Sequence, residues 1–422
     1  MMTKQTKKMH MVRATTLAGV LVAQAAEKGT FSYDAEFVAK HTKAITLKRG
    51  DAQVLIAPAY QGRVMTSTAG GDAGASYGWL NYPVIEKGVL KPEEAKGRLE
   101  EHIFIFGGEE RFWMGPEGGQ NAIFFAPGAD YTFDNWHTPP VIDTEPFEVM
   151  KSSETEVTFA KAFSIRNRQG TLLNGGILRT VRLLDNAAAV KAFGVTLGAA
   201  LKSVAYETDN TLSNAGDKPW TQSEGLLSIW LLGMYKPSPR TTVVIPFKTG
   251  NEAELGPKVN DTYFGKVPPD YLVVKDGVLF FRGDGTRRGK IGISPKRSLG
   301  IAGSYDADSR TLNLVTYNVQ SAPAGYVNSM WETQKEPYTG DVLNSYNDGS
   351  PGEGKPPLGP FYELETSSPA ALLNVGGTMR HVMRTIHIQG PEAELDAIAK
   401  EKLSVGLKEI TGAFKKVPDR PE

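Results

Sequence analysis

The sequence has 422 residues and no cysteine, and its 47 Lys and Arg balance its 47 Asp and Glu. Without net charge there is no field to gather nucleic acid or an anionic membrane, so we expect neither as a partner. The lack of cysteine excludes disulfides, thiolate zinc sites and a cysteine nucleophile. The 45 Gly and 26 Pro indicate many turns, as in β-rich proteins.

Residues 1–25 have the pattern of a signal peptide. The basic segment KKMHMVR precedes a short apolar run from Thr16 to Ala23, and Ala23-Gln24-Ala25 has the small-x-small form of a cleavage site. The alternative is a disordered start that leads into a first helix, because the run is short and contains Gly19. We predict export, to the periplasm or outside the cell. No other stretch is long and apolar enough to span a bilayer.

The next segments predict one helix followed by many strands. Asp34 can cap a short helix through AEFVAKHT. From Ala44 onward, short alternating or apolar runs are divided by Gly, Pro, Asn and Asp, which is typical of strands. Two hairpins are expected, LVVKDGVLFF with a type I′ turn at Asp276-Gly277 and GSYDADSRTLNLVTY with a polar turn at 306–309.

Helix is expected again only at the C-terminus, over residues 390–413, where apolar residues recur at helical spacing in PEAELDAIAKEKL. No linker or repeat divides the strands, so residues 26–422 are predicted to form a single domain. So many strands cannot lie in one open sheet without curling. We therefore predict an all-β fold of two large, packed, mostly antiparallel sheets.

Four stretches concentrate aromatic, polar and acidic residues among glycines and prolines: 100–125, 133–147, 221–230 and 359–373. The last contains Glu363 and Glu365, which share one face if the strand is regular, with carboxylates roughly 7 Å apart. If that face lines a pocket, the pair can accept sugar hydroxyls, bind a cation or move a proton. If it faces solvent, or a β-bulge separates the pair, no such pocket exists.

These stretches suit a carbohydrate, because a pyranose needs an aromatic platform for its C–H face and bidentate polar groups for its hydroxyl edges. The candidate binding residues are Arg111, Trp113, Glu117, Gln120, Trp136 and Glu363. His137 is the best acid/base histidine because it lies in a polar loop, although it could equally bond only a backbone carbonyl. Trp113 and Trp230 lie beside apolar residues and could equally belong to the core.

The segment FYELETSSPAALLNVGGTMRHVMRTIHIQ resembles the C-terminal part of the aldose 1-epimerase (galactose mutarotase) family, and Leu364, Glu365, Thr366 and Pro369 match its motif in order. GGEERFW at 107–113 is similar to that family's arginine segment. GRVMTSTA, GGEERFWMGPEGGQ, FDNWHTPP and GPFYELETSSPAALL more closely resemble an uncharacterised family of exported bacterial proteins in the same superfamily. The resemblance implies a β-supersandwich (galactose mutarotase-like) fold over nearly the whole mature chain.

The resemblance also implies that Glu365 is the catalytic base and Arg111 a sugar-binding residue. An epimerase needs an acid that protonates the ring oxygen. The family supplies it as a histidine, but the matching segment here reads SIWLLG, and Glu117 stands where another family histidine motif would be. Either His137 or His102 then supplies the acid, or the protein binds sugar without epimerising it.

Three functions therefore stay open. The first is an aldose epimerase-like isomerase that acts on a free sugar. The second is a non-catalytic sugar-binding or accessory protein in glycan use. The third is a glycoside-cleaving enzyme whose paired carboxylates lie about 5 to 9 Å apart. We expect a monomer and no cofactor. A cation such as calcium is the alternative, because two glutamates on one face supply hard oxygen ligands, although calcium needs six or more.

Overall fold

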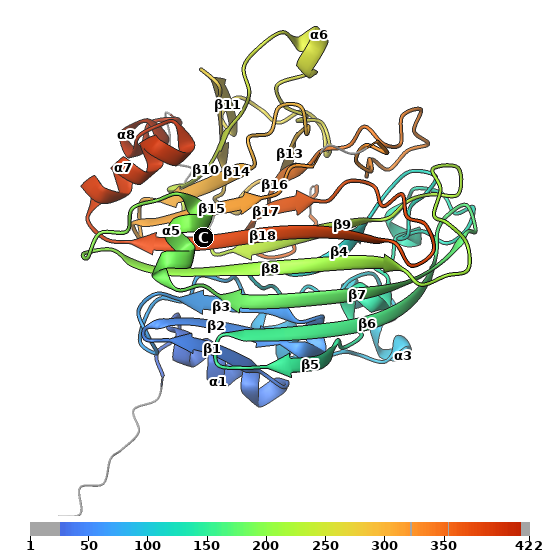
Figure 1. Cartoon of the computed structure of the whole chain (residues 1–422), viewed down its shortest axis with the longest axis horizontal. Coiled ribbons are helices and arrows are strands. Elements are labelled where there is room, and N and C mark those ends of the chain that lie inside the picture. The colour runs from blue at the N-terminus through green and yellow to red at the C-terminus, as the bar shows by residue number, and fades with distance from the viewer. Residues whose placement is uncertain (1–25, 321–322, 353, 415–422) are drawn as a thin grey trace, which may run out of the picture.

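The computed structural model describes residues 26–320, 323–352 and 354–414 (Figure 1). The predicted signal peptide, residues 1–25, lies outside the described residues. In the described part, the strands form sheets of ten, five and three strands, all paired antiparallel. The ten- and five-stranded sheets pack face to face. This confirms the predicted all-β fold built around two large, packed, antiparallel sheets.

The ten-stranded sheet is the large one that faces the viewer in Figure 1. Its strands, in spatial order, are β11 (Leu272–Lys275), β12 (Val278–Arg282), β10 (Thr241–Pro246), β14 (Ile301–Asp306), β15 (Thr311–Tyr317), β18 (Thr378–Gln389), β8 (Lys202–Asn214), β7 (Leu172–Leu183), β6 (Glu156–Arg166) and β5 (Glu148–Ser152).

The five-stranded sheet carries the candidate site. Its order is β13 (Gly289–Ile293), β16 (Leu343–Asn347), β17 (Tyr362–Ser367), β9 (Ser228–Tyr235) and β4 (Arg111–Gly115). A third sheet, which the sequence did not predict, consists of β1 (Ile45–Arg49), β2 (Ala52–Ala57) and β3 (Arg63–Thr68). Its backbone contacts Glu110, just before β4, through an isolated bridge from Val64.

The helices are short. They are α1 (Phe31–His41), α2 (Tyr82–Lys87), α3 (Pro92–Ala95), α4 (Pro140–Asp143), α5 (Asn186–Phe193), α6 (Glu252–Leu255), α7 (Glu392–Leu403) and α8 (Leu407–Thr411), with 3₁₀ turns at Pro58–Tyr60, Leu99–Glu101 and Phe133–Asn135. No helix in the described ranges is long and apolar enough to cross a membrane. Helices α5, α7 and α8 cover one end of the outer face of the ten-stranded sheet, where Leu395, Ile398 and Leu403 are buried in an apolar cluster.

Two predicted helix boundaries differ from the structure. Helix α1 begins at Phe31, three residues before Asp34, and Thr30 is its N-cap. Asp34 is instead a buried residue within the helix, and its carboxylate accepts hydrogen bonds from Ser76 and Tyr82. The predicted C-terminal helix is two helices, since Ser404 adopts a left-handed conformation (φ 64°) that ends α7.

Both predicted hairpins are confirmed. Strands β11 and β12 are joined by Asp276 and Gly277, whose φ angles of 50° and 80° are those a type I′ turn requires. Strands β14 and β15 pair antiparallel, with Ile301 opposite Thr316 and Asp306 opposite Thr311, and residues 307–310 form the turn between them. Turn chemistry therefore placed both of these hairpins correctly.

A buried ion pair connects the ten-stranded sheet to Glu110, the residue just before β4. Arg179 of β7 points inward, and its Nη1 lies 2.8 Å from Oε1 of Glu110 and 2.7 Å from Oδ1 of Asn210. Thr208 donates to the other oxygen of Glu110 at 2.8 Å. The Arg179 and Glu110 side chains are both fully buried. Burial raises the pKa of Glu110, and the positive charge of Arg179 opposes that rise. Arg179 therefore compensates the cost of burying this carboxylate.

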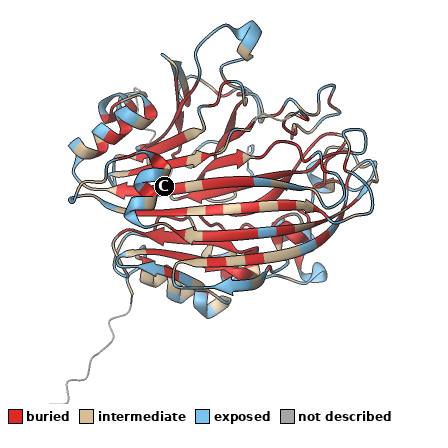
Figure 2. Ribbon diagram, viewed as in Figure 1, coloured by how far each residue is buried: buried red, intermediate tan, exposed pale blue. Residues whose placement is uncertain are grey.

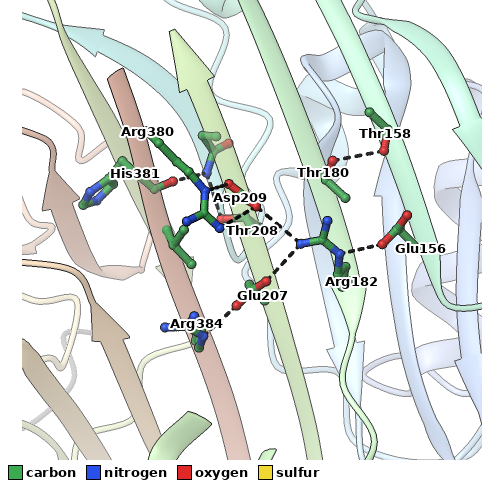
Figure 3. Close-up of polar contacts among 12 residues, drawn as sticks. Glu156, Thr158, Thr180, Arg182, Glu207, Thr208, Asp209, Arg380, His381 and Arg384 are labelled. Carbon is green, nitrogen blue, oxygen red and sulfur yellow. Dashed lines mark hydrogen bonds and ion pairs between the residues drawn. The ribbon is translucent and has the colours of Figure 1, made fainter. Parts of the chain in front are cut away.

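The outer face of the same sheet carries charges that solvent reaches. Figure 3 shows Arg182, also of β7, between Glu156, Glu207 and Asp209, at distances from 2.5 to 3.5 Å. Asp209 and Glu207 also pair with Arg380 and Arg384 of β18. In Figure 2 the exposed residues gather in the loops, the helices and strips of this outer face, while most strand positions are buried.

Asp143, in α4, should make stability depend on pH. Its Oδ2 accepts a hydrogen bond from the Phe104 amide at 2.9 Å, and burial raises the pKa of its carboxyl from 3.8 to about 7. A carboxyl whose pKa is raised on folding stabilises the fold while it is protonated. That contribution is complete below the unfolded pKa near 4 and is lost as pH rises through about 7.

The Asp143→Asn variant mimics the protonated acid at every pH. We expect it to be more stable than wild type above about pH 8, by up to about 4 kcal/mol, and to differ little below about pH 4. Urea denaturation of both proteins across this range measures the difference, which separates Asp143 from other titrating groups. Parallel pH profiles for the two proteins would contradict this assignment.

Candidate functional site

One face of the five-stranded sheet gathers the polar side chains. Glu363 and Glu365 of β17 point the same way, because residues two apart on a strand share a face and no register shift separates them. Across the strands, Glu365 lies opposite Asn344 of β16, and Glu363 lies opposite Tyr346, which in turn lies opposite Lys290 of β13. The pair is buried, so it does not face solvent.

The alternate residues of β17 point to the other side. Thr366 lies 2.9 Å from Nε2 of His381 in the ten-stranded sheet, and the Tyr362 hydroxyl lies 2.8 Å from that of Ser304. Leu364 is fully buried. The sheet therefore has one face that packs against its partner and one that presents the carboxylates.

Each carboxylate is paired with a cation. Nη2 of Arg111 lies 3.0 Å from Oε1 of Glu363, and Nζ of Lys290 lies 2.8 Å from Oε2 of Glu365. Nε1 of Trp230 donates to the same Glu365 oxygen at 3.0 Å. The guanidinium of Arg111 also lies over the Trp113 ring, 4.1 Å from its centroid. Four strands thus fix the position of the pair.

Glu363 and two further acids near it have raised pKa values. Burial raises the pKa of Glu363, the charge of Arg111 opposes that rise, and the charge of Glu365 adds to it. Two further acids lie nearby with raised pKa values for the same main reason. Burial raises the pKa of Asp341 to about 6, and it raises the pKa of Glu117, whose carboxyl also feels the charges of Lys290 and Glu365. The site can therefore hold both proton donors and proton acceptors near neutral pH.

A small cavity lies over this face. It is lined by Gly115, Ser228, Trp230, Tyr263, Lys290, Val327, Ser329, Asp341, Asn344 and Ser367, and its volume is about 20 Å³. That volume suits a single water molecule. Segment 326–340 forms part of its cover, and Trp331 in this segment donates to Glu117 at 3.2 Å. A sugar ring would therefore need this segment to shift.

Four buried polar atoms on the same sheet face lack a hydrogen-bond partner among the described residues. They are Oε1 of Glu365, Oγ of Ser228, Nε1 of Trp113 and Nε of Arg111. Buried polar groups are normally bonded, so such atoms indicate a missing water or ligand. The carboxylate oxygen is an acceptor, the two N–H groups are donors, and the serine hydroxyl can donate or accept. Together these groups complement the hydroxyls of a sugar.

The structure separates the sequence-predicted residues into three groups. Arg111, Trp113, Glu363 and Glu365 share the sheet face. Glu117 and Gln120 lie in the loop after β4, where Gln120 bonds the backbone of Gln334 at 3.0 Å. Gln120 therefore anchors segment 326–340, which covers the cavity, and its side chain is not free to bind a ligand.

The remaining two predicted residues lie outside this face. Trp136 is buried and stacks on Phe124, with ring centroids 5.7 Å apart. His137 is exposed, its Nδ1 lies 3.0 Å from the Glu101 carbonyl, and its ring stacks on His102 at 4.7 Å. None of the described contacts of His137 reaches the carboxylate pair.

Sequence reasoning missed several site residues. Lys290, Tyr263, Asp341 and Asn344 all line the cavity, and so does Trp230, which was noted in a candidate stretch but left out of the predicted site because it could equally belong to the core. A signal existed for Lys290, because it is the one charged residue in the buried strand GKIGI, where a charge needs a partner. Tyr263 and Asp341 come from loops whose approach to the sheet has no sequence signature.

Among the described residues, no three His, Asp or Glu side chains come close enough to hold a metal ion. The two glutamates that calcium would need are each paired with a cation already. Calcium also needs six or more oxygen ligands. The residues in place therefore do not form a calcium site.

Comparison with known proteins gives the family. The family of unknown function DUF6786 matches residues 29–414. The chain belongs to this family. No curated protein matches the sequence significantly. Membership in DUF6786 agrees with the uncharacterised family that the sequence motifs predicted.

Several solved structures resemble this member of DUF6786. The Slr1438 protein from Synechocystis sp. PCC 6803 is 12% identical, with a TM-score of 0.45, and the match covers 83% of this chain and 96% of that one. A galactose mutarotase-like protein from Lactobacillus casei ATCC 334 is 11% identical, with a TM-score of 0.43 and coverages of 82% and 100%. A galactose mutarotase related enzyme from Lactobacillus acidophilus is 9% identical, with a TM-score of 0.44 and coverages of 82% and 97%.

The galactose mutarotase-like superfamily that the sequence motifs indicated stays a prediction. At these identities and TM-scores the likenesses assign no role to any residue.

Proposed function

We propose that this protein binds carbohydrate on the polar face of its five-stranded sheet and acts on a free sugar as an aldose epimerase-like isomerase. The observation that carries the proposal is the buried Oε1 of Glu365, which has no partner among the described residues, while Oε2 of the same carboxylate accepts from Lys290 and Trp230, which line the cavity. A carboxylate oxygen held in place but left unbonded is suited to accept a hydroxyl proton.

In the proposed reaction, Glu365 takes the proton of the anomeric hydroxyl while an acid protonates the ring oxygen, so that the C1–O5 bond breaks and an open-chain aldehyde forms. Rotation about C1–C2 and reversal of both proton transfers close the other anomer. Glu363 suits the acid role better than His137, because its pKa is raised by burial and it shares the face of Glu365. His137 is exposed and contacts His102 instead.

A non-catalytic sugar-binding function is the second candidate. It is favoured by the ion pair between Lys290 and Glu365 at 2.8 Å, since a carboxylate paired with an ammonium group is less free to accept a proton. In that case the same unpartnered atoms would hold sugar hydroxyls without breaking the ring. Export of the protein remains a prediction that both functions share.

The test uses freshly dissolved single anomers of a panel of aldoses. Saturation-transfer NMR measures binding, and polarimetry measures anomeric interconversion with and without the wild-type protein. We expect at least one sugar to bind and to interconvert faster than in buffer. Binding without acceleration would select the second candidate, and neither binding nor acceleration across the panel would contradict the proposal.

A further inference from the structure

A second pocket lies beside the proposed sugar cavity. Its volume is about 40 Å³, and it is lined by Phe264, Gly265, Lys266, Val267, Pro268, Tyr271, Phe281, Arg287, Arg288 and Gly289. The two hollows share two chain segments: Tyr263 and Lys290 line the cavity, while their neighbours in the sequence, Phe264 after Tyr263 and Gly289 before Lys290, line the pocket. A ligand whose ring lay in the cavity could therefore place a substituent in the pocket.

Two guanidinium groups in this pocket have no acidic partner. In the described part of the chain, neither Arg287 nor Arg288 lies within ion-pair distance of a carboxylate, and neither side chain donates a hydrogen bond. Six other arginines have carboxylate partners, and Arg63, Arg166, Arg168 and Arg297 donate to carbonyl or amide oxygens instead. Lys266 pairs with Asp261 at 2.7 Å, so the lining cations without an ion pair among the described residues are the two arginines, of which Arg288 also acts at longer range on the carboxyl of Glu117.

Aromatic rings hold both arginines in place. The Arg288 guanidinium lies 3.8 Å from the centroid of the Phe264 ring, and that of Arg287 lies 5.6 Å from the Tyr271 ring. Phe264 is 45% exposed, and its edge contacts Tyr346, the neighbour of Glu363 on the sheet face. Stacking fixes the plane of a guanidinium and leaves its N–H groups free, which is the arrangement that binds a carboxylate, sulfate or phosphate in a bidentate way.

We propose that this pocket binds an anionic group, and that the substrate is an acidic sugar whose ring lies in the cavity and whose carboxylate, sulfate ester or phosphate ester lies between Arg287 and Arg288. This inference rests on the proposed function, and it names the substrate class. The net charge of the whole chain is zero and gave no sign of an anionic ligand, because the excess of positive charge is confined to this one pocket.

The test compares matched neutral and acidic sugars by NMR titration: galactose with galacturonate, and glucose with glucuronate, glucose 6-sulfate and glucose 6-phosphate. We expect at least one acidic sugar to bind wild type about ten-fold more tightly than its neutral partner. The Arg287→Gln/Arg288→Gln variant should lose that advantage, while Arg49→Gln, which removes an exposed arginine elsewhere, should keep it. Which acidic sugar shows the largest ratio distinguishes a carboxylate from an ester.

Inorganic sulfate and phosphate, titrated into the same proteins, separate this inference from the proposed function. If sugars bind equally well with and without an acidic group, or if the double variant keeps the ten-fold advantage, the anionic pocket is wrong and the proposed function stands. If no sugar binds but the inorganic anions bind wild type and not the double variant, the pocket stands and the proposed function fails. If nothing binds, both are wrong.

Discussion

The Glu365→Gln variant is expected to lose the acceleration of anomeric interconversion by about 100- to 10,000-fold, the usual contribution of a positioned general base. Glutamine has the same shape and can still accept the hydrogen bond from Trp230, which is 3.0 Å long in wild type, but it cannot take a proton. Polarimetry with the best sugar of the panel measures the loss.

Two further variants keep this experiment interpretable. Glu365→Gln leaves the ammonium group of Lys290 buried without its partner, which is destabilising in itself. The Glu365→Gln/Lys290→Met variant removes that charge, so it should regain stability without regaining activity. Glu154→Gln, at an exposed turn, should behave as wild type. Activity retained in a folded Glu365→Gln protein would exclude Glu365 as the base.

Replacing Arg179 with alanine should lower the free energy of unfolding by about 3 to 5 kcal/mol, because it leaves the buried carboxylate of Glu110 without its cation. It also removes bonds to the Gly62 carbonyl and to Asn210. Urea denaturation near neutral pH measures the change. The loss should shrink at low pH, where Glu110 can be neutral in both proteins.

Arg182→Ala is the matched control. Arg182 lies on the same strand, three residues away and on the opposite face, and it also pairs with carboxylates. Its side chain is 35% exposed, so we expect a loss of about 1 kcal/mol or less that diminishes further in high salt. If the two variants lost the same free energy of unfolding, burial would not determine how much the Arg179–Glu110 pair stabilises the protein.

The sequence predicted the architecture well because its signals are local. Strand patterns, the Asp276-Gly277 turn and the high glycine content all act within a few residues. The third sheet and the division of the C-terminal helix were missed. The first depends on which strands find each other over long distances. The second depends on the left-handed backbone of a serine, Ser404, a residue that rarely adopts it.

The site was predicted in part for the same reason. Period-two alternation placed Glu363 and Glu365 on one face, and that holds in the structure. Arg111 joins them through pairing between strands that are far apart in sequence. The contribution of Asp341 depends on tertiary packing that no local pattern records, and a polar loop alone could not show that His137 would stack on His102. Lys290 had a local signal, the one charge in the strand GKIGI, but that signal does not say which carboxylate is its partner.

The alternation of β17 also limits how this protein can diversify. A single residue inserted into or deleted from this strand would turn Glu363 and Glu365 towards the ten-stranded sheet and bring Leu364 and Thr366 to the cavity. That change would bury two carboxylates between the packed sheets and would remove both of them from the candidate site. New specificity can therefore arise by substitution on the strands or by changes of length in the surrounding loops, but not by changes of length in the strand itself.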